Sequence, residues 1–362
     1  MKIIYCIPTL EHGGAERQLS YLALELTGMG HEIHVVFLRA GANLNRLKSG
    51  GVASHQLPPG GNHDPKIFLR LRELIGKIRP DIVQTSLPQM DILGGGAALA
   101  SGARWVLKES SCADAYPAHW KTRLRVLLSK GAHAIVSNSR AGDAYWEAKK
   151  AKCPRYVIPN GVPFDEIAGA QPAADSDLAF EPGGKTVLFA GRMDSGKNVE
   201  NLLVALSRVA DELPVKALLC GDGALRPKLE KLAGELGLAR RLVFTGYVGN
   251  LWALMKRADA FAFLSRFEGC PNVVLEAMAC GCPLIVSDIP THREILDERS
   301  ACFADPDQPA AIAEALKTTL LHGDAARARA GAAQARVARW TIRRMAERYE
   351  KLYLRVLDRD HI

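Results

Sequence analysis

Short runs of apolar residues alternate with amphipathic stretches along nearly the whole chain of 362 residues. An apolar run of about four to eight residues bounded by Gly, Pro or charged residues is typical of a buried strand, whereas apolar positions three and four apart indicate a helix. Strands that alternate with helices in this way predict doubly wound parallel sheets with helices on both faces. The hydrophobic pattern therefore predicts an α/β protein.

The expected elements can be placed by residue number. In the first half, strands are predicted at residues 2–7, 32–38, 53–57, 82–85, 103–108, 134–137 and 155–158. Helices are predicted between them at residues 14–29, 65–78, 90–101, 120–130 and 140–149. In the second half, strands are predicted at residues 185–190, 215–220, 242–245, 260–264, 284–287 and 301–303.

The composition changes between Ala168 and Gly184, where Ala, Pro, Gly and Asp predominate and a linker is expected. A chain of this length is long for one core and comfortable for two α/β domains. We expect Rossmann-like domains and a terminal helix with the following bounds: domain residues 1–165, linker 166–184, domain residues 185–340 and terminal helix 341–362. Because such sheets bind ligands at the carboxyl ends of their strands, we expect the two domains to face a central cleft.

The segment from Glu268 to Glu276 carries two carboxylates eight positions apart. Glu268 lies on the loop that leaves a predicted strand, and Glu276 lies about two turns into the following helix. Backbone amides at the start of that helix form a place for an anionic oxygen. This arrangement suits a ligand that has hydroxyl groups on both sides of a diphosphate. The alternative is a dipole partner and a solvated helix face.

Two further loops after predicted strands carry glycines or cations. Gly13 and Gly14 precede a helix, where paired glycines let a phosphate approach the backbone. Arg192 and Lys197 bracket a Gly-containing turn, and a diphosphate leaving group needs such positive charge when no metal supplies it. The alternatives are a tight turn and ordinary surface cations.

The complete run from Glu268 to Glu276 resembles the E-x7-E motif of retaining glycosyltransferases of family 4, which have the GT-B fold. Its continuation from Ala277 to Val286 is similar to the helix and strand that follow this motif in the family. Other segments that resemble family motifs are Gly13-Gly14-Ala15-Glu16 (GG-x-E), Gly191 to Asn198 (GR-x4-KN), Cys220 to Arg226 and Thr245 to Val248 (both around the base and ribose).

The resemblance implies a GT-B protein whose amino domain binds the acceptor and whose carboxyl domain binds a nucleotide sugar, with the last helix crossing back to the amino domain. It implies that Glu268 contacts a hydroxyl of the transferred sugar, and that Arg192 and Lys197 hold the donor diphosphate. The other donor-binding residues that it implies are Gly13, Gly14, Gly221, Asp222, Val248, Cys270, Pro271, Asn272, Val273 and Glu276, the last on the ribose.

One departure from the family concerns the loop after the strand predicted at residues 103–108. Many family members carry a His there, whereas this chain has Glu109-Ser110-Ser111-Cys112. Glu109 or Ser110 contacts the donor sugar or acceptor, or the loop is polar without a role. A second feature, Asp175 and Asp177, has the D-x-D form of metal-dependent transferases but lies in the linker, so we expect no metal site and no cofactor.

The positive charge of the chain is confined to its first half. Residues 1–165 hold 21 Lys/Arg and 13 Asp/Glu, and this excess equals the net +8 of the whole chain. It is densest in the helix predicted at residues 120–130, whose four cations are Lys121, Arg123, Arg125 and Lys130. Such a helix can bind an anionic membrane surface. The alternative is a wet basic face over a leucine core.

Together these observations predict a metal-independent retaining glycosyltransferase, a hexosyl- or N-acetylhexosaminyl-transferase. We expect a UDP-sugar donor, a lipid-linked or other saccharide acceptor, no nucleic-acid partner, and a cytoplasmic location that is peripheral on the inner face of the plasma membrane. Cysteines without a paired framework indicate reduced thiols. The alternatives are a GT-B nucleotide-sugar epimerase or hydrolase and a basic nucleic-acid-binding protein. The sequence leaves open the donor sugar and base, the acceptor, the linkage and the oligomeric state.

Overall fold

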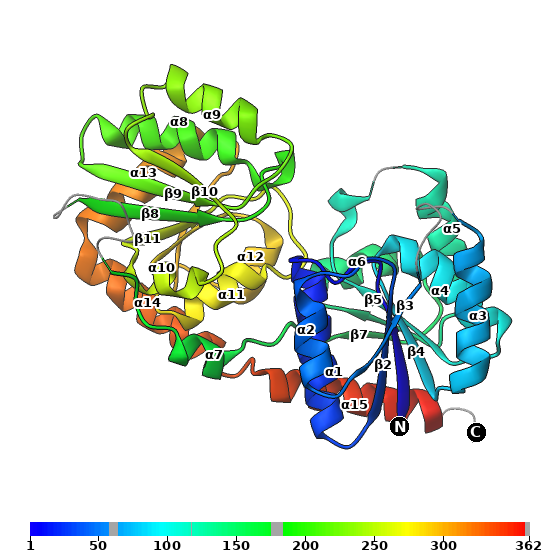
Figure 1. The fold of residues 1–362 in the computed structure, drawn as a ribbon. Coiled ribbons are helices and arrows are strands. Elements are labelled where there is room, and N and C mark those ends of the chain that lie inside the picture. Colours follow the sequence, from blue (N-terminus) through cyan, green and yellow to red (C-terminus); the bar gives the residue numbers. More distant parts are fainter. Residues whose placement is uncertain (58–63, 117, 175–183, 359–362) are drawn as a thin grey trace. The chain divides into compact units, whose positions relative to one another are not determined.

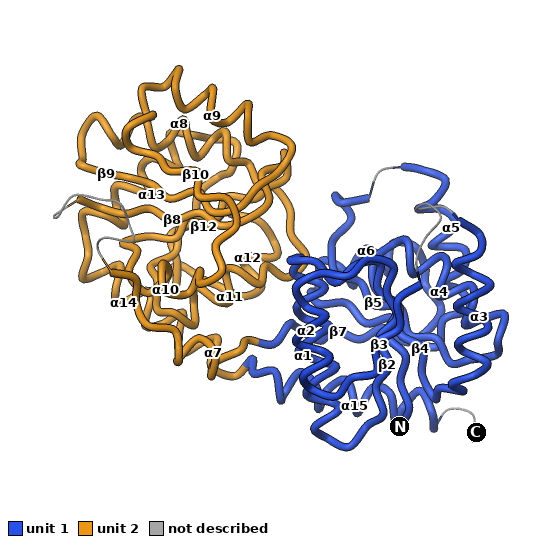
Figure 2. Tube along the Cα trace, viewed as in Figure 1, with its two compact units in different colours: residues 1–161, 340–362 blue, residues 162–339 orange. Residues whose placement is uncertain are grey.

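The computed structural model describes residues 1–57, 64–116, 118–174 and 184–358. The chain forms two compact units (Figure 2). Unit 1 comprises Met1–Gly161 and Trp340–Ile362, and unit 2 comprises Val162–Arg339. Each unit has its own parallel sheet with helices on both faces (Figure 1), which confirms the predicted α/β class.

The sheet of unit 1 has seven strands in the order β3-β2-β1-β4-β5-β6-β7, and all neighbouring pairs are parallel. The predicted ends of these strands differ from the observed ends by two residues or fewer. The strands are β1 (Lys2–Cys6), β2 (Glu32–Phe37), β3 (Ala53–Gln56), β4 (Ile82–Ser86), β5 (Trp105–Glu109), β6 (Ala134–Ser137) and β7 (Arg155–Val157).

Helices cover both faces of this sheet. They are α1 (Gly14–Gly28), α2 (Ala42–Ser49), α3 (Lys66–Ile78), α4 (Pro88–Ala100), α5 (Trp120–Ser129), α6 (Arg140–Ala148) and α15 (Ile342–Asp358), with the 3-10 turn η1 (Ala113–Ala115). The hydrophobic pattern did not predict α2, because it is short and mostly polar. Tertiary contacts hold it instead, since Leu47 is fully buried and the Asn43 side chain donates to the Leu10 carbonyl at 3.3 Å.

Helix α15 follows unit 2 in the sequence but belongs to unit 1, where it packs beside α1. Its buried side chains recur three and four residues apart and join the core on one face of the sheet. The Tyr353 hydroxyl donates to Gln84 Oε1 at 2.7 Å and lies 3.0 Å from the Tyr5 hydroxyl. A second core lies under α3, α4 and α6 and includes Trp105 and Trp146.

Helix α5 differs from the prediction, in which all four of its cations face a membrane or water. Arg125 is buried, with only 1% of its surface exposed, so the prediction that it faces a membrane is wrong. Trp120 and Leu127 of the same helix are exposed, by 62% and 59%. Among the residues described, no helix combines the length and apolar character that are needed to cross a bilayer.

The sheet of unit 2 has six parallel strands in the order β10-β9-β8-β11-β12-β13. They are β8 (Lys185–Ala190), β9 (Val215–Cys220), β10 (Leu242–Gly246), β11 (Ala260–Phe263), β12 (Leu284–Ser287) and β13 (Cys302–Ala304). The helical elements are α7 (Phe164–Gly169), η3 (Ser195–Lys197), α8 (Val199–Ala210), α9 (Arg226–Glu235), α10 (Leu251–Arg257), α11 (Asn272–Ala279), α12 (Pro290–Ile295), α13 (Pro309–Leu321) and α14 (Gly323–Val337). Helix α7 extends into the segment predicted as a linker.

Candidate active site

The strand order of unit 2 creates a switch point between β8 and β11. The chain runs from β8 toward β9 on one side and from β11 toward β12 on the other. The loops that leave these two strands therefore diverge, and ligands of such sheets bind in the crevice between them. Arg192 and Lys197 lie on the loop after β8, and Glu268 lies on the loop after β11.

The structure pairs Lys197 directly with Glu268, although the two residues are 71 positions apart in the sequence. The two side chains are 23% and 11% exposed, so the pair is accessible at its edge. The Lys197 ammonium also lies 5.1 Å from the ring centroid of Phe263. The sequence proposed both residues for the site but did not predict that they would neutralise each other.

Hydrogen bonds fix the shape of the loop that carries Lys197. The Asp194 carboxylate accepts from the Lys197 amide at 3.2 Å at the start of η3. Asn198 is fully buried in the left-handed region (φ 56°), which Asn adopts more readily than most residues. Its side-chain amide donates to the carbonyls of Leu264, at 3.2 Å, and Pro306, at 2.6 Å. Asn198 therefore ties the loop after β8 to the end of β11, a role that sequence reasoning missed.

Helix α12, which follows β12, holds the backbone at Glu268. The Thr291 hydroxyl, at the start of α12, donates to the Glu268 carbonyl at 2.9 Å. His292 is completely buried, with Nδ1 2.9 Å from the Ser287 carbonyl. Burial lowers the pKa of His292. A neutral imidazole that donates from Nδ1 to this carbonyl keeps Nε2 unprotonated.

Glu276 has a different environment from Glu268. It lies in the second turn of α11 and is 2% exposed. One carboxylate oxygen accepts from Trp252 Nε1, on α10, at 3.0 Å. No pattern in the sequence indicated Trp252, because it is 24 positions away on a short helix. The first residues of α11 follow Pro271, and its amino end has no side-chain cap. Cys270 and Pro271 precede this helix, and Asn272 and Val273 begin it; their contact with a donor stays a prediction.

The backbones of the loops after β8, β9 and β10 are joined to one another. The Met193 amide donates to the Asp222 carbonyl at 2.9 Å, and the Gly221 amide donates to the Gly246 carbonyl at 2.7 Å. Gly221 has φ 126°, and a Cβ there would lie 2.0 Å from the Gly191 carbonyl oxygen. Only glycine fits this approach. Packing thus accounts for Gly221, and its contact with a ligand stays a prediction.

The other residues predicted for the site lie on separate loops. Arg192 is exposed and makes no ion pair among the residues that the structure describes, and Val248 is partly buried on the loop after β10. The Asp222 carboxylate accepts from the Gly223 amide at 2.7 Å. Gly13 is the N-cap of α1 in unit 1, next to Gly14, and the Glu16 carboxylate fills the space that its Cβ would need. Asp175 and Asp177 lie outside the described residues.

The chain matches two family models, "Glycosyltransferase Family 4" over residues 12–166 and "Glycosyl transferases group 1" over residues 171–336. Among solved structures it is similar to Anabaena HepE in complex with UDP and glucose (TM-score 0.87, 19% identity, 97% of this chain and 99% of that chain). It is also similar to WaaG, a glycosyltransferase involved in lipopolysaccharide biosynthesis (TM-score 0.77, 15% identity, 97% and 99%). These likenesses, with the two parallel-sheet units, define the GT-B fold.

One relative in Campylobacter jejuni, a GalNAc-alpha-(1->4)-GalNAc-alpha-(1->3)-diNAcBac-PP-undecaprenol alpha-1,4-N-acetyl-D-galactosaminyltransferase, is 30% identical over 77% of this chain and 77% of its own length. The chain therefore belongs to glycosyltransferase family 4, as its motifs predicted. A phosphatidyl-myo-inositol mannosyltransferase of Mycobacterium tuberculosis is 33% identical over 54% of this chain and 53% of its own length. Another Campylobacter relative, an N-acetylgalactosaminyltransferase, is matched over only 44% of its length.

Proposed function

We propose that this glycosyltransferase moves a sugar from a UDP-sugar to a saccharide acceptor with retention of anomeric configuration. The observation that carries the proposal is the meeting of Lys197 and Glu268 at the switch point of unit 2. A cation for a diphosphate and a carboxylate for a sugar hydroxyl lie side by side there, beside the uncapped start of α11.

Binding of the donor would exchange the partners of this ion pair. A diphosphate that approaches the helix start competes for Lys197, and the released Glu268 carboxylate accepts from a sugar hydroxyl. Arg192, which is exposed, adds a second cation. Negative charge grows on the diphosphate as the glycosidic bond breaks, so these cations stabilise the transition state more than the bound donor. Glu276, held by Trp252, accepts from the ribose hydroxyls.

In this proposal the acceptor hydroxyl attacks the sugar from the face that the diphosphate leaves. A leaving oxygen of the diphosphate takes the acceptor proton, so the step needs no carboxylate nucleophile. Arg192 and Lys197 supply the positive charge that a metal ion would otherwise provide. The acceptor class follows from the relatives, of which one is named for a diphospho-undecaprenol saccharide and another for phosphatidyl-myo-inositol. We infer a lipid-linked saccharide, reached from the cytoplasmic membrane face with the help of α5.

A donor panel tests the proposal before any acceptor is known. UDP-glucose, UDP-galactose and their N-acetylated forms are compared with GDP-mannose, first by thermal shift and then by release of the free nucleotide. We expect one UDP-sugar to raise the melting temperature and to be slowly hydrolysed. Conversion of the UDP-sugar into its epimer without release of UDP would instead identify an epimerase. No response to any nucleotide sugar would overturn the proposal.

Metal dependence is tested on the same reaction. Because Arg192 and Lys197 supply the positive charge, nucleotide release should continue in EDTA. Arg192→Ala and Lys197→Ala should each slow nucleotide release strongly, while the free energy of unfolding changes little. Loss of activity in EDTA with recovery in Mg²⁺ or Mn²⁺ would contradict this assignment and would bring Asp175 and Asp177 back as candidate ligands.

A further inference from the structure

The loop after β11, which ends at Glu268, lies directly against the loop after β8. The Arg266 amide donates to the Gly196 carbonyl at 2.9 Å, and the Arg266 guanidinium donates to the Ser195 carbonyl at 2.9 Å. A Cβ on Gly196 would lie 3.0 Å from the Phe267 ring, so this ring packs closely on the Gly196 backbone. The two residues that precede Glu268 are therefore held by the two residues that precede Lys197.

The same loop is held on its other side by hydroxyl groups from the end of β12 and the start of α12. The Ser287 hydroxyl donates to the Ser265 carbonyl at 2.6 Å, and the Thr291 hydroxyl donates to the carbonyl of Glu268 itself at 2.9 Å. Ser287 is completely buried, and Thr291 is 4% exposed. Because such buried hydrogen bonds are shielded from water, they restrict the backbone that accepts them.

His292 fixes Ser287 in turn. Its Nδ1 lies 2.9 Å from the Ser287 carbonyl oxygen and 3.1 Å from the Ser287 hydroxyl. The imidazole is completely buried, and its ring centroid lies 6.1 Å from that of Phe263 on β11. His292 therefore packs between the ends of β11 and β12, where the Ser287 hydroxyl reaches across from one strand to the other.

The side chains that donate to the carbonyls of this loop are uncharged. Asn198 donates to Leu264 through its amide, and Ser287 and Thr291 donate through hydroxyls. A charged donor at these places would attract the Glu268 carboxylate in competition with Lys197. Neutral donors fix the backbone of Glu268 through contacts that do not involve its side chain, so they persist when the ion pair with Lys197 opens.

We propose that Thr291 and Ser287 are positioning residues for sugar transfer, whose hydroxyls keep the Glu268 carboxylate in place when the donor diphosphate takes Lys197 from it. A group that must meet one hydroxyl in the transition state depends on a fixed backbone, since a misplacement of about 1 Å can cost about a hundredfold in rate. The role of Glu268 in this step rests on the proposed transferase function. Thr291 lies 23 positions after Glu268, outside the segment that ends at Glu276.

The experiment uses the full chain and a matched pair of substitutions, Thr291→Val and Thr319→Val. Thr319 is 2% exposed, and its hydroxyl donates to the Ala315 carbonyl at 2.9 Å within α13. Both changes therefore remove a buried hydroxyl-to-carbonyl bond from unit 2, and only the first removes it from Glu268. Thr291→Ser keeps the hydroxyl and serves as the rescue variant, and Ser287→Ala tests the second contact.

Three quantities are measured for each protein. They are kcat and KM for release of UDP from the UDP-sugar that the donor panel selects, the Kd for UDP, and hydrogen exchange of the backbone amides of residues 264–270 without ligand. Two further proteins carry Glu268→Ala alone and Glu268→Ala together with Thr291→Val.

We expect Thr291→Val and Ser287→Ala each to speed exchange in residues 264–270 and to lower kcat about three- to tenfold, the loss of one hydrogen bond between uncharged groups. KM and the Kd for UDP should change by less than about twofold, because the lost interaction acts in the transition state. Thr291→Ser and Thr319→Val should keep the kcat of the wild type. In the Glu268→Ala protein, Thr291→Val should cause no further loss, because the carboxylate that it positions is absent.

Several results would overturn the proposal. Equal losses of kcat in the two Thr→Val variants would assign the effect to any buried hydroxyl of unit 2. A wild-type kcat in Thr291→Val would exclude the positioning role, and a further loss in the Glu268→Ala protein would show that Thr291 acts independently of Glu268. A wild-type protein that releases no UDP from any UDP-sugar would instead contradict the proposed function, and unchanged exchange in Thr291→Val would separately show that this hydroxyl does not hold the loop.

Discussion

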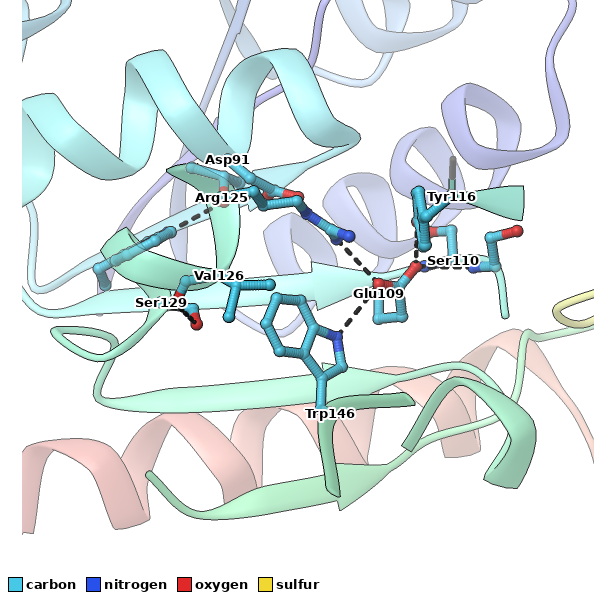
Figure 3. Close-up of polar contacts among 11 residues, drawn as sticks. Asp91, Glu109, Ser110, Tyr116, Arg125, Val126, Ser129 and Trp146 are labelled. Atoms are coloured by element: carbon cyan, nitrogen blue, oxygen red, sulfur yellow. Dashed lines mark hydrogen bonds and ion pairs between the residues drawn. The ribbon is translucent and has the colours of Figure 1, made fainter. Parts of the chain in front are cut away.

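Each unit has a cation paired with a carboxylate at the carboxyl end of its sheet. The two sites differ in how far the side chains are exposed and in how many hydrogen bonds the carboxylate already accepts. The Lys197–Glu268 pair of unit 2 is single and partly exposed, with side chains 23% and 11% accessible. In unit 1, Arg125 pairs with Asp91 at 2.7 Å and with Glu109 at 2.9 Å in a buried cluster (Figure 3). The Glu109 carboxylate of this Arg125 cluster already accepts from five donors, two of them backbone amides. The first pair is therefore accessible from solvent at its edge, whereas the Glu109 carboxylate is enclosed by donors of the protein itself.

The comparison separates two uses of the same chemistry. In unit 2 the hydrogen bonds of Asn198 and Thr291 fix the backbone and leave the charged groups at the edge of the site. In unit 1 the charged groups themselves fix the backbone. A charge that binds a ligand must exchange partners at low cost, so partial exposure suits it, whereas a buried structural charge is tolerated only when paired and hydrogen-bonded.

The largest expected effect is on stability, from breaking the buried cluster. Arg125→Met should lower the free energy of unfolding by about 3 to 5 kcal/mol, because it leaves two buried carboxylates without their cation. Urea unfolding measures the change. The matched control is Arg343→Met, whose side chain is 57% exposed in its pair with Glu347, so this change should hardly alter the free energy of unfolding. Equal losses in the two variants would contradict the distinction between the sites.

The next effect is on turnover in unit 2. Glu268→Ala should cut turnover by about a hundredfold or more, since it removes a contact to the reacting sugar, while the Kd for UDP stays nearly constant. Lys197 loses its partner in this variant and remains available to the diphosphate. Glu276→Ala is the control, and it should weaken UDP itself because the ribose contact does not involve the sugar. Equal loss of UDP affinity in both variants would refute this division of roles.

Much of the fold could be predicted from the sequence, because an apolar run identifies a buried strand without knowledge of its neighbours. All the strands were placed within two residues, whereas α2 was missed because Asn43 and Leu47 stabilise it through distant contacts. The motif residues of the candidate site were predicted by resemblance. Their partners were not, since Trp252 lies 24 positions from Glu276, and Lys197 lies 71 positions from Glu268.

Arg125 shows most clearly what the sequence alone cannot predict. On a helical pattern it lies among cations and leucines, and nothing local distinguishes it from Lys121 or Arg123. Its burial depends on Asp91, 34 positions earlier, and Glu109, 16 positions earlier. The sequence shows that Arg125 is charged, but the packing of α5 against α4 and β5 determines whether its guanidinium is exposed to solvent.

The third prediction concerns pH and Asp91. Burial raises the pKa of Asp91 to about 6, although Arg125 and the Thr85 hydroxyl act in the opposite direction. The native state therefore binds the proton more tightly than the unfolded state, whose Asp pKa is about 4, and the contribution of Asp91 to stability falls as pH rises from about 4 to about 6. Asp91→Asn removes this titration. The difference in unfolding free energy, wild type minus variant, should fall by about 2 to 3 kcal/mol between pH 4 and pH 7 and then stay level. A flat difference over this range would show that Asp91 does not titrate there.

The smallest expected effect concerns the surface of α5, where the burial of Arg125 changes which residues can meet a membrane. Lys121, Arg123 and Lys130 remain as the cations of this helix, beside the exposed side chains of Trp120 and Leu127. Changing the three cations together to Gln should weaken binding to anionic vesicles by up to about 1 kcal/mol for each charge removed, because each cation near the surface contributes about that much at low salt. The matched control changes three cations of unit 2 to Gln: Lys228, Lys231 and Arg240. Cosedimentation with phosphatidylglycerol vesicles measures both variants, and the Kd for UDP should be the same in each. Equal weakening in the two variants would assign the attraction to net charge rather than to α5, and a wild-type protein that ignores these vesicles at low salt would remove the peripheral-membrane proposal.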